Sequence, residues 1–113
     1  MIRLVVMYNL PEGADESEFL GWRLGPHQQS NATLPQTLRA DFGRTIRAWP
    51  DDKVPRFRFI TTIDWPDLES FEAAFYAPDV QAGLNENIKK LGEFEYSIAE
   101  ILTSTDNIGK TLP

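Results

Sequence analysis

Apolar and polar residues follow one another in blocks along the chain, and these blocks predict four strands. Residues 2–8 form a nearly continuous apolar run rich in β-branched side chains, which favours a central strand buried on both faces. Residues 38–49 place apolar side chains on one face, and residues 56–65 and 94–102 alternate plainly. Because only the proline-containing turn 50–55 separates the second strand from the third, we expect these two strands to pair as an antiparallel hairpin.

The first segment with helical spacing lies between the first two predicted strands. It begins after Asp15, whose side chain is of the type that caps helix N-termini, and it runs into the segment near His27. The pair Gly25-Pro26 is expected to end or kink this helix, because proline removes a backbone donor and crowds the preceding turn. We expect residues 28–36 to form a polar loop.

Two more helical segments follow the predicted hairpin, the first after the cap Asp67 and the second restarting at Pro78. The resulting order is strand, helix, strand, strand, helix, strand. This order predicts a ferredoxin-like split βαβ domain of the α+β class, a four-stranded antiparallel sheet with all helices on one face. We expect a single domain over residues 1–103 and a C-terminal tail over residues 104–113.

The predicted topology places the end of the first helix relative to the sheet. We expect the first and third strands to be parallel neighbours in its centre, so that His27 lies over the start of both. Its expected neighbours are Leu4, Ile46, Phe57 and Phe59 from the strands and Phe75 and Tyr76 from the second helix. Tyr8 and Trp65 are expected together at the opposite end of the sheet.

The sheet face that points away from the helices is too apolar to stay in contact with water. It carries Val5, Met7, Ile60, Thr62, Ala99 and Ile101, with only a few charged residues among them. No other segment of the chain is left to cover this face, and a second copy of the same sheet is its simplest cover. We therefore expect a homodimer formed through the sheet face.

Composition excludes several classes of partner. The 113 residues include 17 acidic and 11 basic side chains, for a formal net charge of -6, and no cysteine. A negative surface repels phosphate groups, so neither nucleic-acid binding nor docking on an anionic membrane is expected. The apolar start of the chain is too short to span a bilayer and has no small-residue cleavage site. A cytoplasmic location is the resulting expectation.

His27 is the only histidine, and imidazole is the side chain whose ordinary pKa suits proton transfer near neutral pH. Phe19, Trp22 and Arg23 lie on the same face of the predicted helix. Two interpretations stay open at this point. His27 is either a structural residue whose ring nitrogens are satisfied by nearby backbone, or a general acid/base in an aromatic pocket.

The other candidate residues are also consistent with ordinary structure. Aromatic side chains of the sheet–helix layer either pack the core or line a cavity; they are Trp22, Phe57, Phe59 and Phe75. Arg44 and Glu100 interrupt apolar strand faces, and each lies either at the rim of the sheet or in a pocket. One histidine with scattered carboxylates does not make a metal site, and no glycine-rich phosphate loop follows a strand. We therefore expect neither a metal nor another cofactor.

Two motifs resemble the EthD family of dimeric α+β barrel proteins. Residues 19–27 read Phe-x-x-Trp-Arg-x-x-x-His, similar to the family helix Phe-x-x-Tyr/Trp-x-x-x-x-His, although here the proline precedes the histidine. Residues 63–82, from Ile-Asp-Trp-Pro-Asp-Leu to Ala-Pro-Asp-Val-Gln-Ala, resemble the family's strand-to-helix motif. The resemblance covers about residues 1–102. It implies a dimeric barrel with a small-molecule pocket between sheet and helices.

Two classes of function are compatible with these residues. The first is a cofactorless enzyme, an isomerase, lyase or oxygenase, that acts on a small cyclic or aromatic carbonyl compound with His27 as acid/base. The second is a non-catalytic binding or accessory protein of a degradation pathway that uses the same cavity. In both cases the ligand is small and apolar or aromatic. The expected contacts are Leu4, Trp22, Arg44, Phe57, Phe59, Phe75 and Tyr76.

Overall fold

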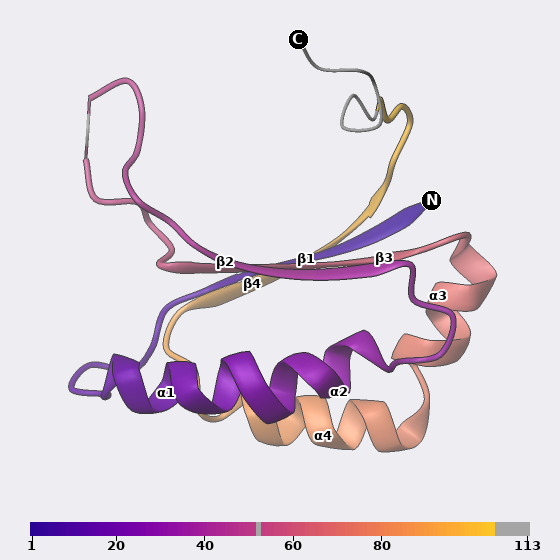
Figure 1. Cartoon of the computed structure of the whole chain (residues 1–113), viewed down its shortest axis with the longest axis horizontal. Helices are drawn as coiled ribbons and strands as arrows, with labels where there is room; N and C mark the ends of the chain where they lie inside the picture. The colour runs from indigo at the N-terminus through magenta and orange to yellow at the C-terminus, as the bar shows by residue number, and fades with distance from the viewer. Residues whose placement is uncertain (52, 106–113) are drawn as a thin grey trace, which may run out of the picture.

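The computed structural model describes residues 1–51 and 53–105. Four strands form one antiparallel sheet in the order β2-β3-β1-β4, and the helices all cover the same face of it (Figure 1). The strands are β1 (Ile2–Tyr8), β2 (Arg39–Arg44), β3 (Phe59–Trp65) and β4 (Phe94–Glu100). The helices are α1 (Glu16–Trp22), α2 (Gln28–Ala32), α3 (Leu68–Phe75) and α4 (Pro78–Ile88), with the π-helical turn η1 (Arg23–His27) joining α1 to α2. The predicted ferredoxin-like α+β fold is confirmed; of the predicted tail, residues 106–113 lie outside the described residues.

The two central strands, β1 and β3, run antiparallel, so the prediction of a parallel pair is wrong. The helical crossover brings β2 back in the direction of β1, and the hairpin then reverses β3 against both. In the observed register Tyr8 pairs with Phe59 and Ile2 pairs with Trp65. Tyr8 and Trp65 therefore lie at opposite ends of the sheet, and Phe59 lies at the Tyr8 end.

Alternation along β1 and β3 directs one set of side chains into the sheet–helix core. Along β1 every second residue is buried and the residues between are half-buried, so only one face of this central strand is fully covered. The largest apolar side chains of the core are Trp65, Phe59 and Phe71, each at most 1% exposed. The ring of Phe59 lies 5.3 to 5.6 Å, between centroids, from Phe19, Phe42 and Tyr8. These four rings fix the start of α1 over the sheet.

We expect Phe59→Ala to lower the free energy of unfolding by about 3–5 kcal/mol, because it empties a fully enclosed site among three other rings. Urea denaturation followed by circular dichroism measures this loss. Phe94→Ala is the matched control, since Phe94 is 42% exposed at the edge of the sheet and its removal leaves a smaller void. Equal losses in the two variants would contradict this description of the core.

The first helix was predicted to end or kink at Gly25-Pro26; it does not end there, and its winding changes from α to π over Arg23–His27. In an α-helix the proline ring would crowd the carbonyl four residues earlier. A π turn bonds residues five apart, and the wider backbone of η1 accommodates Pro26. Residues 28–32, predicted to lie in a loop, consequently form α2. The result is one continuous helical arm, from Glu16 to Ala32, that crosses the sheet (Figure 1).

The connection between β2 and β3 is longer than predicted, because β2 ends at Arg44 and β3 begins at Phe59. We call residues 45–51 and 53–58 the β2–β3 arm. It contains two prolines, which cannot donate to a strand ladder. The arm projects on the side of the sheet opposite the helices (Figure 1). Three of its apolar side chains are 85–91% exposed, namely Ile46, Trp49 and Val54.

Candidate functional site

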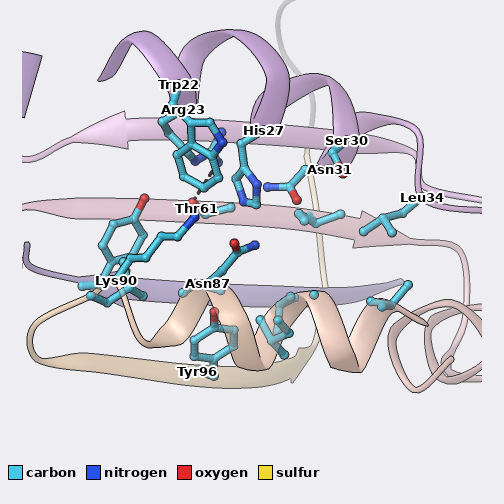
Figure 2. Close-up of a pocket in the computed structure, with 18 of the residues that line it drawn as sticks. Trp22, Arg23, His27, Ser30, Asn31, Leu34, Thr61, Asn87, Lys90 and Tyr96 are labelled. Atoms are coloured by element: carbon cyan, nitrogen blue, oxygen red, sulfur yellow. Dashed lines mark hydrogen bonds between the residues drawn. The ribbon is translucent and has the colours of Figure 1, made fainter. Parts of the chain in front are cut away.

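A cavity of about 730 Å³ lies between the sheet and the helical layer. One wall comes from α1, η1 and α2, the opposite wall comes from α4, and the sheet forms the floor (Figure 2). The floor is apolar apart from hydroxyl groups; its residues are Leu4, Val6, Tyr8, Thr61, Ile63 and Tyr96. The volume falls in the range of roughly 300–1,000 Å³ that small-molecule sites occupy.

His27 closes the turn η1, and its ring points into the cavity beside the amide of Asn31 (Figure 2). The imidazole stacks on the indole of Trp22, with 4.3 Å between ring centroids and an interplanar angle of 25°. Within residues 1–51 and 53–105 no hydrogen bond engages its nitrogens, and no polar side-chain atom there is both buried and unpartnered. The ring nitrogens of His27 are therefore open to the cavity.

The surroundings of His27 keep its ring neutral at pH 7. Burial, followed by the positive charges of Arg23 and Lys90, lowers the pKa of His27 to about 4. Lys90 follows α4, and its ammonium lies 5.3 Å from the ring centroid of Trp22. The imidazole therefore presents a proton acceptor to the cavity across the physiological pH range.

Arg23 is a charged side chain that is only 1% exposed. Its Nη1 donates to Oε1 of Gln28 at 2.8 Å, and its Nη2 donates to Oγ1 of Thr61 at 3.0 Å. The guanidinium carbon lies 4.1 Å from the ring centroid of Phe42. In the described part of the chain no carboxylate pairs with Arg23, so its charge is held by neutral partners alone.

Two tyrosine hydroxyls complete the polar groups of the floor. Burial raises the pKa of Tyr8, and this effect outweighs the charge of Arg23 and the hydrogen bonding with Arg23 and Thr61, which act in the opposite direction. Burial also raises the pKa of Tyr96 to about 12. Both phenols are consequently protonated at neutral pH and can donate a hydrogen bond to a ligand.

Four of the residues predicted from the sequence line this cavity, namely Leu4, Trp22, His27 and Phe75. The other four predicted contacts do not line it. Arg44 is exposed and forms an ion pair with Glu16 at 3.5 Å. Phe57 is buried beneath the guanidinium of Arg56, Phe59 is enclosed in the core, and Tyr76 is 52% exposed. Because β3 runs opposite to the predicted direction, the Phe57 and Phe59 end of the strand is carried away from His27.

Sequence reasoning missed several polar groups that line the cavity, and the main ones are Tyr8, Arg23, Thr61, Lys90 and Tyr96. Tyr8 was expected beside Trp65 at the far end of the sheet from His27; the register instead separates Tyr8 from Trp65, and Tyr8 lines the same cavity as His27. A signal for Arg23 was present, because it shares an apolar helix face with Phe19 and Trp22. An arginine on the buried face of a helix needs a partner there.

The fold and the cavity together define the class of this protein. The chain is a ferredoxin-like α+β domain with a cavity of small-molecule size between its sheet and its helices. Among the residues described, no three His, Cys, Asp or Glu side chains converge as a metal site requires. In the same part of the chain no helix is long and apolar enough to cross a membrane.

Comparison with solved structures gives this class a closer definition. The chain is similar in fold to an ethyl tert-butyl ether D (EthD) family protein from Bacillus halodurans, at 21% identity and a TM-score of 0.72, over 90% of this chain and 99% of that one. The expected resemblance to the EthD family is thus confirmed in the fold. No sequence-family model and no curated protein matches the chain.

Two further structures share the fold at lower identity. A hydroxynitrile lyase from Passiflora edulis is 11% identical, with a TM-score of 0.72 over 93% of this chain and 96% of that one. A dimeric ferredoxin-like protein from Thermobifida fusca is 14% identical, with a TM-score of 0.65 over 88% of this chain and 90% of that one. At these identities the similarity defines the architecture and leaves the reaction open.

Proposed function

We propose that this protein binds a small cyclic or aromatic carbonyl compound in the cavity and catalyses a proton transfer on it, with His27 as the acid/base group. The observation that carries the proposal is the state of His27, a neutral ring in a cavity wall whose nitrogens have no partner among the described residues. A histidine bonded to backbone beside a filled core would instead favour a binding or accessory protein.

The surrounding residues suit a proton transfer. An isomerase, a lyase or an oxygenase acting on such a compound removes a proton from carbon or oxygen, and His27 is the acceptor. The stacked indole of Trp22 fixes the plane of the imidazole, and Leu4 and Phe75 provide apolar walls that displace water. The protonated hydroxyl of Tyr96 is a donor for the carbonyl oxygen. The lyase that shares this fold supports an enzymatic role.

A binding experiment tests this proposal without knowledge of the substrate. We expect acetophenone, a small aromatic ketone, to shift the ring NMR signals of His27, which are unambiguous because the chain has one histidine. Leu84→Trp should abolish the shift, since Leu84 lines the cavity and a larger side chain fills it. The matched control Leu68→Trp places the same ring on α3, where Leu68 is 51% exposed and outside the cavity lining.

Two outcomes of this experiment would contradict the proposal. His27 signals that titrate at the ordinary histidine pKa and do not respond to acetophenone would place the imidazole outside any ligand site. A response that survives Leu84→Trp would place the ligand elsewhere on the protein.

We further propose that the protein is a homodimer formed through the open face of the sheet. The observed register sets Val5 beside Thr62 and Met7 beside Ile60 at the centre of this face. These side chains are half-buried within one chain, and all helices lie on the other side (Figure 1). Such a central apolar patch fits a second copy of itself, since a twofold axis pairs identical surfaces. The dimeric structure from Thermobifida fusca supports this arrangement.

The rim of the open face is consistent with the same assembly. The β2–β3 arm and the segment after β4 both leave the sheet on its open side (Figure 1). They carry exposed apolar residues, Trp49 at 90% and Leu102 at 86%, which a partner sheet between them would cover. On this face Arg3 forms an ion pair with Asp64 at 2.7 Å. We propose that the two projections enclose the partner from both edges.

A further inference from the structure

Two positive charges line the cavity without an ion-pair partner in the described part of the chain: Arg23, which is buried, and Lys90, which is exposed. Arg23 is held by the neutral side chains of Gln28 and Thr61, and Lys90 lies against the ring of Trp22. Over residues 1–51 and 53–105 neither cation has an ion-pair partner, whereas the neighbouring Lys89 pairs with Glu86 at 3.0 Å. These two cations therefore line one cavity in a chain whose net charge is negative, at -6.

A buried cation without a counter-ion is unfavourable, because it loses its hydration and gains no charge partner. The guanidinium has five N–H donors, and two hydrogen bonds engage it here. Tyr8 also lines the cavity, close enough to Arg23 that the charge of the guanidinium lowers the pKa of the phenol, although burial raises it more. Arg23 and a protonated phenol that can donate to a ligand therefore line the same part of the cavity.

From this geometry we propose that the natural ligand is an organic anion, a small cyclic or aromatic carboxylate. Its carboxylate is bound by the Tyr8 hydroxyl, which Arg23 supports, and by the ammonium of Lys90. The inference rests on the proposed small-molecule function of the cavity and defines its substrate class. The apolar remainder of the ligand then lies along Leu4, Ile63 and Phe75, which line the same cavity.

An anion in this position also changes His27. In the free protein the cations Arg23 and Lys90 oppose protonation of the ring, and its pKa is about 4, so it is a weak base. A bound carboxylate favours the imidazolium and raises that pKa toward its ordinary value of 6.5. Proton abstraction is most efficient when the pKa of the base is near the working pH. The substrate itself thus makes His27 a better base.

Other ionisable groups also face the cavity from the elements packed around His27. They are Tyr8 on β1, Tyr96 on β4, Asp15 and Glu18 at the start of α1, and Asp79 on α4. The two phenols stay protonated at neutral pH. No carboxylate is among the groups that shift the pKa of His27, so the anion has no competing charge at the ring.

The test compares benzoate with benzamide, its neutral analogue of nearly the same shape, by NMR titration of His27 at pH 7. We expect benzoate to bind about tenfold more tightly than benzamide and to raise the pKa of His27, which benzamide does not. Lys90→Gln should reduce this preference several-fold. The matched control Lys89→Gln removes the same charge one residue away and should leave the preference unchanged.

Arg23→Met extends the test to the buried cation and should reduce the preference to nearly one. Because Arg23 is buried, an amide correlation spectrum first establishes whether Arg23→Met is folded. If this variant is unfolded, the result for Lys90→Gln alone tests the proposal. Equal binding of benzoate and benzamide to the wild-type protein would overturn the anion inference and leave the proposed cavity function standing. Binding of neither compound would remove both.

Discussion

His27→Gln lowers turnover about 10²- to 10⁴-fold and leaves ligand affinity nearly unchanged, if His27 is the proton acceptor. Glutamine keeps a polar side chain of similar reach and cannot take up a proton at neutral pH. Turnover of a carbonyl compound that shifts the His27 signals, measured as kcat and KM separately, checks this expectation. The control Gln29→Ala alters an exposed residue of α2 outside the cavity lining and should retain full turnover. A loss confined to KM would assign His27 to binding alone.

The same substitution has a second expected effect that needs no substrate. The pKa of His27 is about 4 in the folded chain and near 6.5 when unfolded. As the pH falls, the unfolded chain takes up the proton first, so His27 lowers the stability of the fold progressively between about pH 6.5 and pH 4. Urea denaturation at pH 7 and pH 5 should show a smaller loss of unfolding free energy in His27→Gln than in the wild-type protein. Equal losses would mean that the imidazole is not buried.

Ile60→Asp separates the proposed dimer into monomers. Ile60 lies on the open face, paired with Met7 of β1, and a carboxylate there would be desolvated against the partner sheet. A stable interface of this kind buries on the order of 2,000 Å² or more, so one central charge has a large effect. Light scattering should give half the wild-type mass at micromolar concentration.

Leu68→Asp is the matched control for this experiment. Leu68 is 51% exposed on α3, on the helical side of the sheet, and the same chemical change there should leave the mass unaltered. A wild-type protein that is a monomer at every concentration would contradict the dimer. An Ile60→Asp variant with unchanged mass and melting temperature would show that another surface forms the interface.

Most of the fold could be predicted from local patterns in the sequence. The central strand β1 and the cap at Asp67 depend only on residues close in the chain, and both predictions agree with the structure. The predicted burial of β1 on both faces is not observed within one chain, where buried and half-buried residues alternate. The direction of β3 relative to β1 depends on how the crossover and the hairpin combine in space. Reading it as parallel reversed the ends of β3 and placed Phe57 and Phe59 beside His27 instead of Thr61 and Ile63.

The candidate site was less accessible to sequence reasoning than the fold. His27 and Trp22 could be identified because histidine chemistry and aromatic spacing are visible in one segment. The group formed by Tyr8, Arg23 and Lys90 comes from β1, η1 and the segment after α4. These residues are brought together only by tertiary packing. The sequence around a single tyrosine or lysine does not indicate which distant residues it will contact.

The π turn at residues 23–27 has a consequence for the angular position of the imidazole. Each residue of an α-helix turns the chain by about 100°, so side chains five positions apart diverge by about 140°. Trp22 and His27 are five apart and yet stack, which the wider turn makes possible. Relaxation to a regular α-helix would rotate His27 off the indole, and Pro26 opposes it because its ring would meet the carbonyl of Trp22. The orientation of the imidazole is thus set by the backbone winding of η1, which brings residues five apart onto one face, as a regular α-helix does for residues four apart.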